Sequence, residues 1–241
     1  MSLSKEAIQH IQETAIEPEE RYIVVDDRSF IIDNEGYGQE IKRHVTTGLK
    51  SHTLSALVEY IRNIDYQDEK LFLHIEDERT VALWSQFKED GTRDLLFTSC
   101  AIVPNQNFKN FLSAEQLNIE LQSKFKQNTD RDILLQVVGN IKDESVQNTS
   151  DDGVSQSVTI KQGVASVASA RVPNPVTLTP YSTFQEVEQP ERLFIFRMRE
   201  GAKGALIDTD DNSWQLKAIQ NIKEYLELNL AVVKQPVVIL G

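Results

Sequence analysis

Residues 71–103 read LFLHIEDERTVALWSQFKEDGTRDLLFTSCAIV, and this stretch decides the fold. It contains three runs of strand-forming residues, which are separated by charged turns at residues 76–79 and 88–91. Asp90–Gly91 is a strong hairpin signal, because glycine tolerates the positive φ that a tight turn demands. The stretch therefore predicts an antiparallel meander of strands.

An amphipathic helix is predicted immediately before this meander. Its apolar residues recur at intervals of three and four, which is typical of one buried stripe. Thr53 or Ser51 can cap its first turn. The residues predicted to form the stripe are Leu54, Leu57, Val58 and Ile61.

Residues 1–50 are predicted to form an acidic arm of helix and strand. We expect an amphipathic helix over residues 4–17 and two short strands over residues 21–33. The polar, glycine-containing stretch that follows, residues 36–48, is expected to be a long connection. The first 35 residues carry three basic and nine acidic side chains, a net charge of −6, which is half of the formal −12 of the chain.

Beyond the meander, apolar spacing predicts a helix over residues 105–127, which Ser113 could restart with a new cap. A further helix is expected over residues 130–141, with Asp130 as its cap. Residues 142–153 are polar and acidic, which indicates an exposed loop.

The last third of the chain predicts strands and one final helix. Residues 154–172 alternate small polar and β-branched residues, which suits strands. An extended piece (172–184), an apolar strand (193–199) and a short strand (205–207) follow. A helix over Trp214–Leu230 ends this series. Its predicted inward residues are Leu216, Ile219, Ile222, Leu226 and Leu230.

These elements come in clusters and not in strict βαβ alternation, so an α+β fold is favoured over α/β. We expect antiparallel sheets with about four or five helices clustered around them. Residues 51–241 would then form the main α+β domain, next to the arm of residues 1–50.

Composition limits the classes of partner. The chain has 37 acidic and 25 basic residues, and this balance opposes non-specific attraction to nucleic acid or anionic membrane. No apolar run is long enough to span a bilayer, and the opening residues lack the apolar core of a signal peptide. The single cysteine, Cys100, fits a reducing compartment. We therefore expect a soluble, cytoplasmic protein.

No arrangement of residues predicts catalysis, a cofactor or a metal. The histidines are not spaced as helical metal ligands. Cys100 lies in an apolar run, which predicts a buried structural thiol and not a nucleophile. Acidic clusters at Asp26–Asp27, Glu76–Glu78 and Asp208–Asp211 could each bind a divalent cation. The first two fall at strand turns, where charged side chains are usually just solvated. We expect a non-enzymatic protein without a cofactor.

Two features predict an interaction surface. One is a basic cluster on the strand 193–199 and its flanks, where alternation directs the phenylalanines toward the core and the arginines away from it. The other is the apolar tail Val232–Leu240, which either pairs with a neighbouring subunit or forms the last strand of its own sheet. The predicted surface residues are Arg192, Arg197, Arg199, Lys203, Val237, Val238 and Ile239.

The order of segments also resembles a known family. The segments are SALVEYIRNI (55–64), LFLHIEDERTVALWSQF (71–87), NFKNFL (107–112), ILLQVVGNI (133–141), VPNPVTLTPYSTF (172–184) and LFIFRMREG (193–201). Together they resemble a prophage protein family of unknown function typified by YfdQ. This chain has a shorter middle region and a different C-terminal tail. The resemblance covers residues 50–210 and implies a bacteriophage or prophage origin, with no catalytic residues to carry over.

These features together predict a phage accessory protein that self-associates or binds a phage or host protein. Two alternatives stay open. One is a nucleic-acid-linked factor in phage replication or recombination, which the net charge disfavours. The other is an acidic inhibitor of a host defence system.

Overall fold

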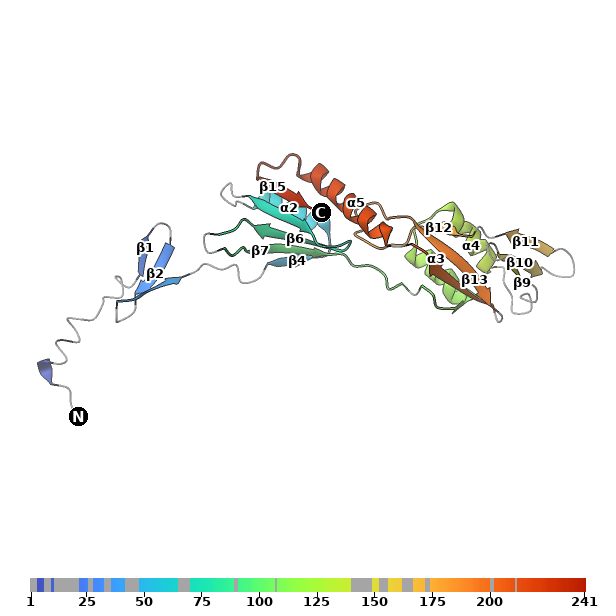
Figure 1. Ribbon diagram of the computed structural model, residues 1–241, viewed down its shortest axis with the longest axis horizontal. Coiled ribbons are helices and arrows are strands. Elements are labelled where there is room, and N and C mark those ends of the chain that lie inside the picture. Colours follow the sequence, from blue (N-terminus) through green and yellow to red (C-terminus); the bar gives the residue numbers. More distant parts are fainter. Residues whose placement is uncertain are drawn as a thin grey trace. The chain divides into compact units, whose positions relative to one another are not determined.

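The computed structural model describes the chain in segments (Figure 1). The described residues are 4–6, 10, 22–25, 28–32, 36–41, 48–64, 70–88, 91–106, 108–139, 149–151, 156–161, 167–171, 174–199, 202–210 and 212–241. They divide into two compact units, Met1–Thr46 and Thr47–Gly241, and each unit is described by itself.

The first unit contains a three-stranded antiparallel sheet in the order β1-β2-β3. The two strands predicted over residues 21–33 are confirmed as β1 and β2. The predicted connection over residues 36–48 is wrong in part, because Gly38–Ile41 pairs with the free edge of β2 and satisfies its backbone groups. Most of the helix predicted over residues 4–17 lies outside the described residues. The strands are β1 (Tyr22–Val25), β2 (Arg28–Ile32) and β3 (Gly38–Ile41).

The second unit contains a five-stranded sheet in the order β15-β5-β6-β7-β4. The predicted meander is confirmed, since β5, β6 and β7 are antiparallel neighbours. The two outer strands are parallel to their neighbours, so the expectation of purely antiparallel sheets is wrong here. A helix separates β4 from β5 and another precedes β15, and a helical crossover is what parallel pairing requires. The strands are β4 (Leu49–Ser51), β5 (Leu71–Ile75), β6 (Thr80–Ser85), β7 (Leu95–Cys100) and β15 (Val237–Leu240).

Helices α2 (Leu54–Asn63) and α5 (Ser213–Leu230) share one hydrophobic core with this sheet. The predicted cap of α2 is confirmed, because the Thr53 hydroxyl accepts a hydrogen bond from the Ala56 N–H at 3.4 Å. The predicted buried stripe of α2 is confirmed as well. In α5 the prediction for Leu216 is wrong. Its side chain is 72% exposed, because the inward face of the helix follows Trp214, Ala218, Asn221, Ile222, Leu226 and Leu230.

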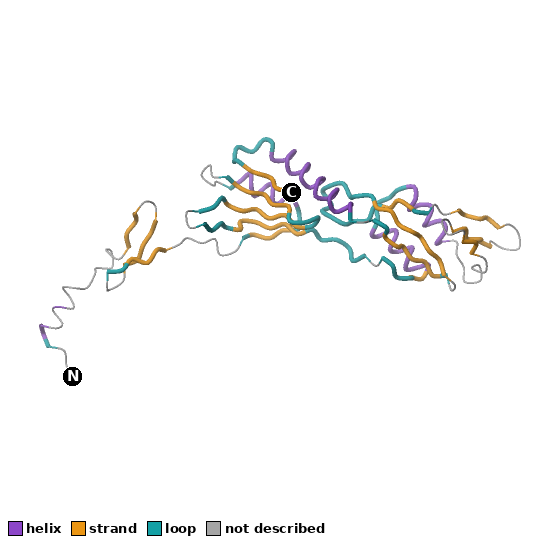
Figure 2. Tube along the Cα trace, in the orientation of Figure 1, coloured by secondary structure: helices purple, strands orange, loops and turns teal. Residues whose placement is uncertain are grey.

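A second sheet of this unit has the order β12-β13-β14-β8 and is antiparallel throughout. Helices α3 and α4 pack against one face of it and form a second hydrophobic core (Figure 2). The predicted inward direction of Phe194, Phe196 and Met198 is confirmed, because all three belong to this core. The elements are β8 (Leu112–Ser113), α3 (Ala114–Lys124), α4 (Thr129–Gly139), β12 (Val176–Leu178), β13 (Arg192–Arg199) and β14 (Lys203–Asp208).

Two helix starts differ from the prediction. The helix predicted over residues 105–127 begins only at Ala114, because Ser113 forms a capping box with Gln116 and the two residues of β8 pair with β14. Asp130 is not the cap of α4. The Asn128 side chain accepts the Arg131 N–H at 2.8 Å, and the Asp130 carboxylate accepts the Thr177 N–H instead.

A third sheet has the antiparallel order β11-β10-β9. It confirms the strands predicted over residues 154–172. Of the predicted loop over residues 142–153, residues 149–151 form a strand and the others lie outside the described residues. The strands are β9 (Thr149–Asp151), β10 (Gln156–Lys161) and β11 (Val167–Arg171).

The α+β class is confirmed, with four helices, α2 to α5, in the described part of the chain. None of the described helices is long and apolar enough to cross a bilayer.

Candidate functional site

The predicted surface residues separate into three places in the second unit. Arg192 lies in the protein interior. Arg197, Arg199 and Lys203 lie around the β13–β14 hairpin, and the other three residues, Val237, Val238 and Ile239, form most of β15. The predicted set is therefore not one continuous patch.

The prediction that Arg192 belongs to an interaction surface is wrong, because its side chain is only 6% exposed. It has the same strand parity as Phe194, and so it faces the core. Its guanidinium carbon lies 4.5 Å from the Trp214 ring centroid and 5.2 Å from that of Phe108. An ion pair with Asp208, which lies opposite Phe194 in the β13–β14 register, compensates the buried charge.

Burial lowers the pKa of Arg192 to about 10, an effect that the negative charge of Asp210 opposes. The guanidinium is therefore still protonated at neutral pH. Its Nη1 donates weakly to the Ser182 hydroxyl at 3.4 Å. Ser182 in turn accepts the Arg79 Nε–H through its carbonyl at 3.1 Å, so these contacts join β13 to the β5–β6 turn. This geometry is that of a structural ion pair.

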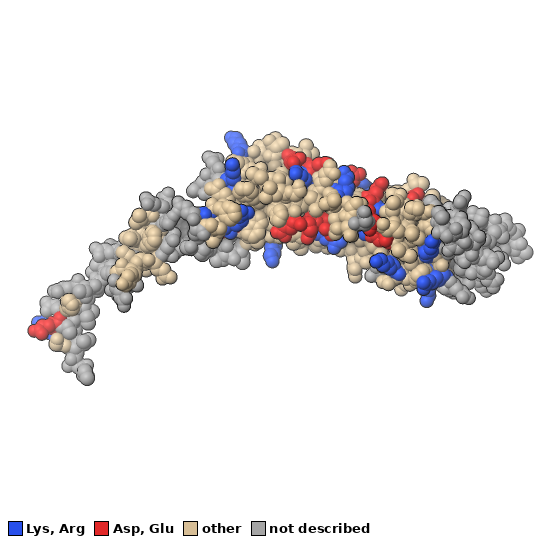
Figure 3. Space-filling view, in the orientation of Figure 1, with Lys and Arg blue, Asp and Glu red and all other residues tan. Residues whose placement is uncertain are grey.

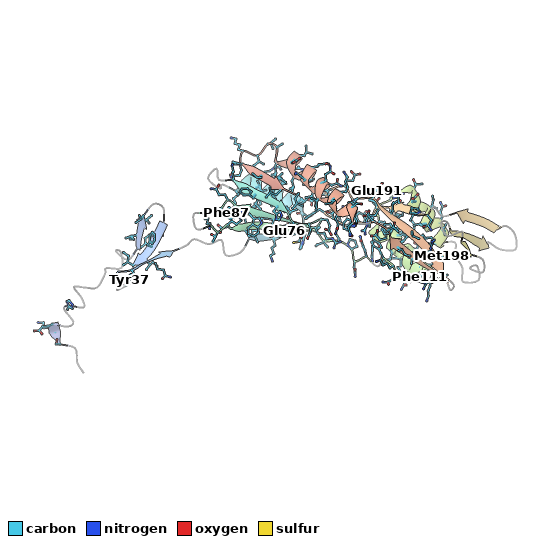
Figure 4. All side chains as sticks on the ribbon, in the orientation of Figure 1. Tyr37, Glu76, Phe87, Phe111, Glu191 and Met198 are labelled. Carbon is cyan, nitrogen blue, oxygen red and sulfur yellow. The ribbon has the colours of Figure 1, made fainter. Side chains whose placement is uncertain are left out.

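The basic outer face of the hairpin is defined by Arg197, Arg199 and Lys203. Arg199 lies directly opposite Lys203 in the β13–β14 register, and both side chains are exposed. The Arg199 guanidinium carbon lies 3.9 Å from the centroid of the Phe111 ring. Figure 4 labels Phe111 at the same end of the sheet as Met198. The apolar spacing of the sequence predicted a helix at Phe111, and only the pairing of β8 reveals its place beside the arginine.

The apolar tail forms β15, the last strand of its own sheet, and pairs in parallel with β5. Because β15 is the outermost strand, its other edge faces no strand in the described residues. Val238 and Leu240 are 36% and 44% exposed. The Lys223 ammonium donates to the Gly241 carbonyl at 3.1 Å and so holds the end of the strand against α5.

The other candidate groups have ordinary structural partners. Cys100 is exposed and not buried as predicted, because β7 alternates and its neighbour Ser99 takes the inward position. The carbonyl of Cys100 lies 2.8 Å from the His52 ring nitrogen Nδ1. Asp77 accepts the Arg79 N–H within its turn at 2.7 Å. Within the described ranges, no group of three or more His, Cys, Asp or Glu side chains could hold a metal ion.

A scan against protein-family models, a search of curated proteins and a search of solved structures found no match to this chain. Two surfaces therefore stand as candidate contact sites on geometry alone. One is the outer edge of β15, and the other is the basic outer face of the β13–β14 hairpin. Figure 3 shows Lys and Arg side chains on the part of this unit that contains β13.

Proposed function

We propose that this chain is a non-enzymatic phage or prophage accessory protein that acts by self-association, with β15 as the contact strand. The observation that carries the proposal is the edge of the five-stranded sheet at β15, which carries no charged side chain and faces no strand among the described residues. Two copies of β15 that pair antiparallel across a two-fold axis would join two such sheets into one.

The two edges of this sheet differ in a way that supports β15. Strand β4, at the opposite edge, is only three residues long and carries the exposed Lys50 in its middle. A short edge strand with a lysine is a common protection against pairing with another chain. Strand β15 has the sequence VVIL and carries no charged side chain. Of the two edges, β15 is the one without this protection.

Charge supports a neutral contact strand as well. The chain has a formal charge of −12, so two copies carry a net repulsion when they approach each other. A contact through uncharged side chains and backbone groups brings no charged side chains of the two strands into direct contact. Salt screens the net repulsion, and we expect self-association to strengthen as ionic strength rises.

The setting in a phage or prophage follows from the resemblance of residues 50–210 to the family typified by YfdQ. We place the protein in the cytoplasm of the bacterial host as part of this proposal. A phage or host protein that adds its own strand to β15 would use the same edge.

Multi-angle light scattering over a range of protein concentrations tests the proposal. We expect the wild-type chain to dimerise, and Val238→Lys to be monomeric because it introduces the edge protection that β15 lacks. Val232→Lys is the matched control, because Val232 is 82% exposed and lies before β15. A wild-type chain that stays monomeric at its highest soluble concentration, in low and high salt, would contradict self-association.

A further inference from the structure

The hairpin β13–β14 places two like charges directly opposite each other. Arg199 pairs with Lys203 in the register, and both side chains are exposed on the same face of the sheet. Like charges at directly opposed positions destabilise an antiparallel pair. An anion bound between them would remove this repulsion, which makes the pair a candidate anion site.

Two further cations lie on or beside the same hairpin. Arg197 is two residues before Arg199, so both side chains project from the same face. Its Nη1 is buried and finds no hydrogen-bond partner among the described residues. Lys109 is exposed, and its backbone N–H donates to the Leu206 carbonyl of β14 at 2.8 Å. Within the described segments, no ion pair joins any of these four cations to a carboxylate.

Arg197, Arg199 and Lys203 lie on the face opposite to the helices. Gly204 faces α3, because a Cβ atom on it would lie 2.6 Å from Leu117 Cδ2. Its neighbour Lys203 therefore projects from the other face. Helices α3 and α4 form their core with the inner residues of the sheet, such as Phe196. The basic face is thus the side that these two helices leave uncovered.

An aromatic ring completes the arrangement. The β8–β14 register pairs Leu112 with Gly204, so Phe111, one residue earlier, projects from the basic face. The Arg199 guanidinium carbon lies 3.9 Å from its ring centroid. A guanidinium that lies against a ring is a planar surface on which an unpaired base can stack.

We propose that this basic face binds single-stranded nucleic acid. Phosphates would lie between Arg199 and Lys203, and a base would stack on the Arg199–Phe111 pair. Positive side chains along a backbone track together with an aromatic platform are the features of sequence-tolerant single-strand binding. The net charge of −12 does not cancel this local field, because charges more than about 8 Å away are largely screened at physiological salt.

Fluorescence anisotropy with a labelled oligothymidine of about 15 nucleotides tests the proposal over a range from low to physiological salt. With phosphate contacts at Arg199 and Lys203, log K should fall with log salt with a slope of about −1.4. Lys203→Glu should abolish binding and raise Tm, because it replaces a repulsive cross-strand pair by an attractive one. Lys217→Glu, the same charge change at an exposed position of α5, should leave most of the binding intact.

A second variant separates stacking from charge. Phe111→Leu should weaken oligothymidine binding about five-fold or more and leave the salt slope unchanged, because it removes the ring but no cation. Polyphosphate at the same phosphate concentration should bind more weakly than the oligonucleotide. The absence of binding across the whole salt range would overturn the proposal, and so would Lys203→Glu binding like the wild type. Polyphosphate binding as tightly as the oligonucleotide, or an oligoglutamate peptide binding more tightly, would also overturn it.

Discussion

Glu186 caps helix α2 across a long stretch of the chain: its Oε2 atom accepts the N–H of Leu54 at 2.7 Å. Its Oε1 atom accepts the N–H of Ser55 at 2.8 Å. The first turn of α2 has no acidic residue of its own. Glu186 therefore supplies both the hydrogen-bond acceptors and the negative charge that a helix N-terminus favours. It thereby ties the segment before β13 to the core of the five-stranded sheet.

Replacement of this cap should destabilise the fold. We expect Glu186→Ala to lower the free energy of unfolding by about 1–2 kcal/mol, because two N–H groups lose their acceptor. Urea denaturation measures the change, and hydrogen exchange at Leu54 and Ser55 should accelerate. Glu188→Ala, at an exposed position two residues later, should change stability by less than about 0.5 kcal/mol. Equal effects of the two variants would show that the cap contributes nothing.

The buried ion pair of Arg192 and Asp208 should be sensitive to the loss of one partner. Asp208→Ala leaves the guanidinium uncompensated in the interior, and we expect a loss of about 3–5 kcal/mol in unfolding free energy. In Arg192→Met with Asp208→Leu no charge remains buried, and much of this loss should be recovered. The exposed pair of Glu59 and Arg62 is the control, and Glu59→Ala should cost less than about 0.5 kcal/mol. If Asp208→Ala lowers the free energy of unfolding by no more than Glu59→Ala does, the expected cost of an uncompensated Arg192 is wrong.

Tyr60 and Tyr225 should lose their phenolic protons at a pH above the usual range. Burial raises the pKa of Tyr60, and burial together with the negative charge of Glu186 raises the pKa of Tyr225. Because both folded values lie above that of the unfolded chain, their contribution to stability is complete below pH of about 10 and is lost as pH rises further. An ultraviolet titration of phenolate absorbance should show these late-titrating groups. In the double variant Tyr60→Phe with Tyr225→Phe, the part of the absorbance change that occurs at the highest pH should disappear. A titration curve identical to that of the wild type would show that these two tyrosines are not the late-titrating groups.

Two glycines should respond in opposite directions to the same substitution. A Cβ atom on Gly204 would lie 2.6 Å from Leu117 Cδ2 and 3.2 Å from Phe196 Cε2, so Gly204→Ala should cost about 1–3 kcal/mol through overpacking. A Cβ atom on Gly139, the last residue of α4, has 3.8 Å to its nearest neighbour. Gly139→Ala should be neutral or stabilise by up to about 1 kcal/mol. Thermal unfolding of the two variants side by side measures both, and a stable Gly204→Ala would show that the sheet and α3 can move apart.

The direction of some candidate surface residues could be predicted from the sequence, and that of Arg192 could not. Alternation along residues 193–199 correctly separated Phe194 and Phe196 from Arg197 and Arg199, because side-chain direction in a strand depends only on local geometry. The same parity also places Arg192 inside, next to Asp208. A buried arginine was not expected from its type, since only a partner on another strand makes such burial tolerable.

The sequence by itself determined the elements whose signals lie within a few residues. The stripe and Thr53 cap of α2, the β5–β7 meander and the capping signal at Ser113 all depend on helical period, strand alternation or a neighbouring hydroxyl. Only the tertiary structure decided that β15 pairs with β5, that Glu186 caps α2 and that Phe111 meets Arg199. Those contacts join residues far apart in the chain. Whether they form depends on which backbone hydrogen-bonding groups and which charged side chains have no other partner in the folded chain.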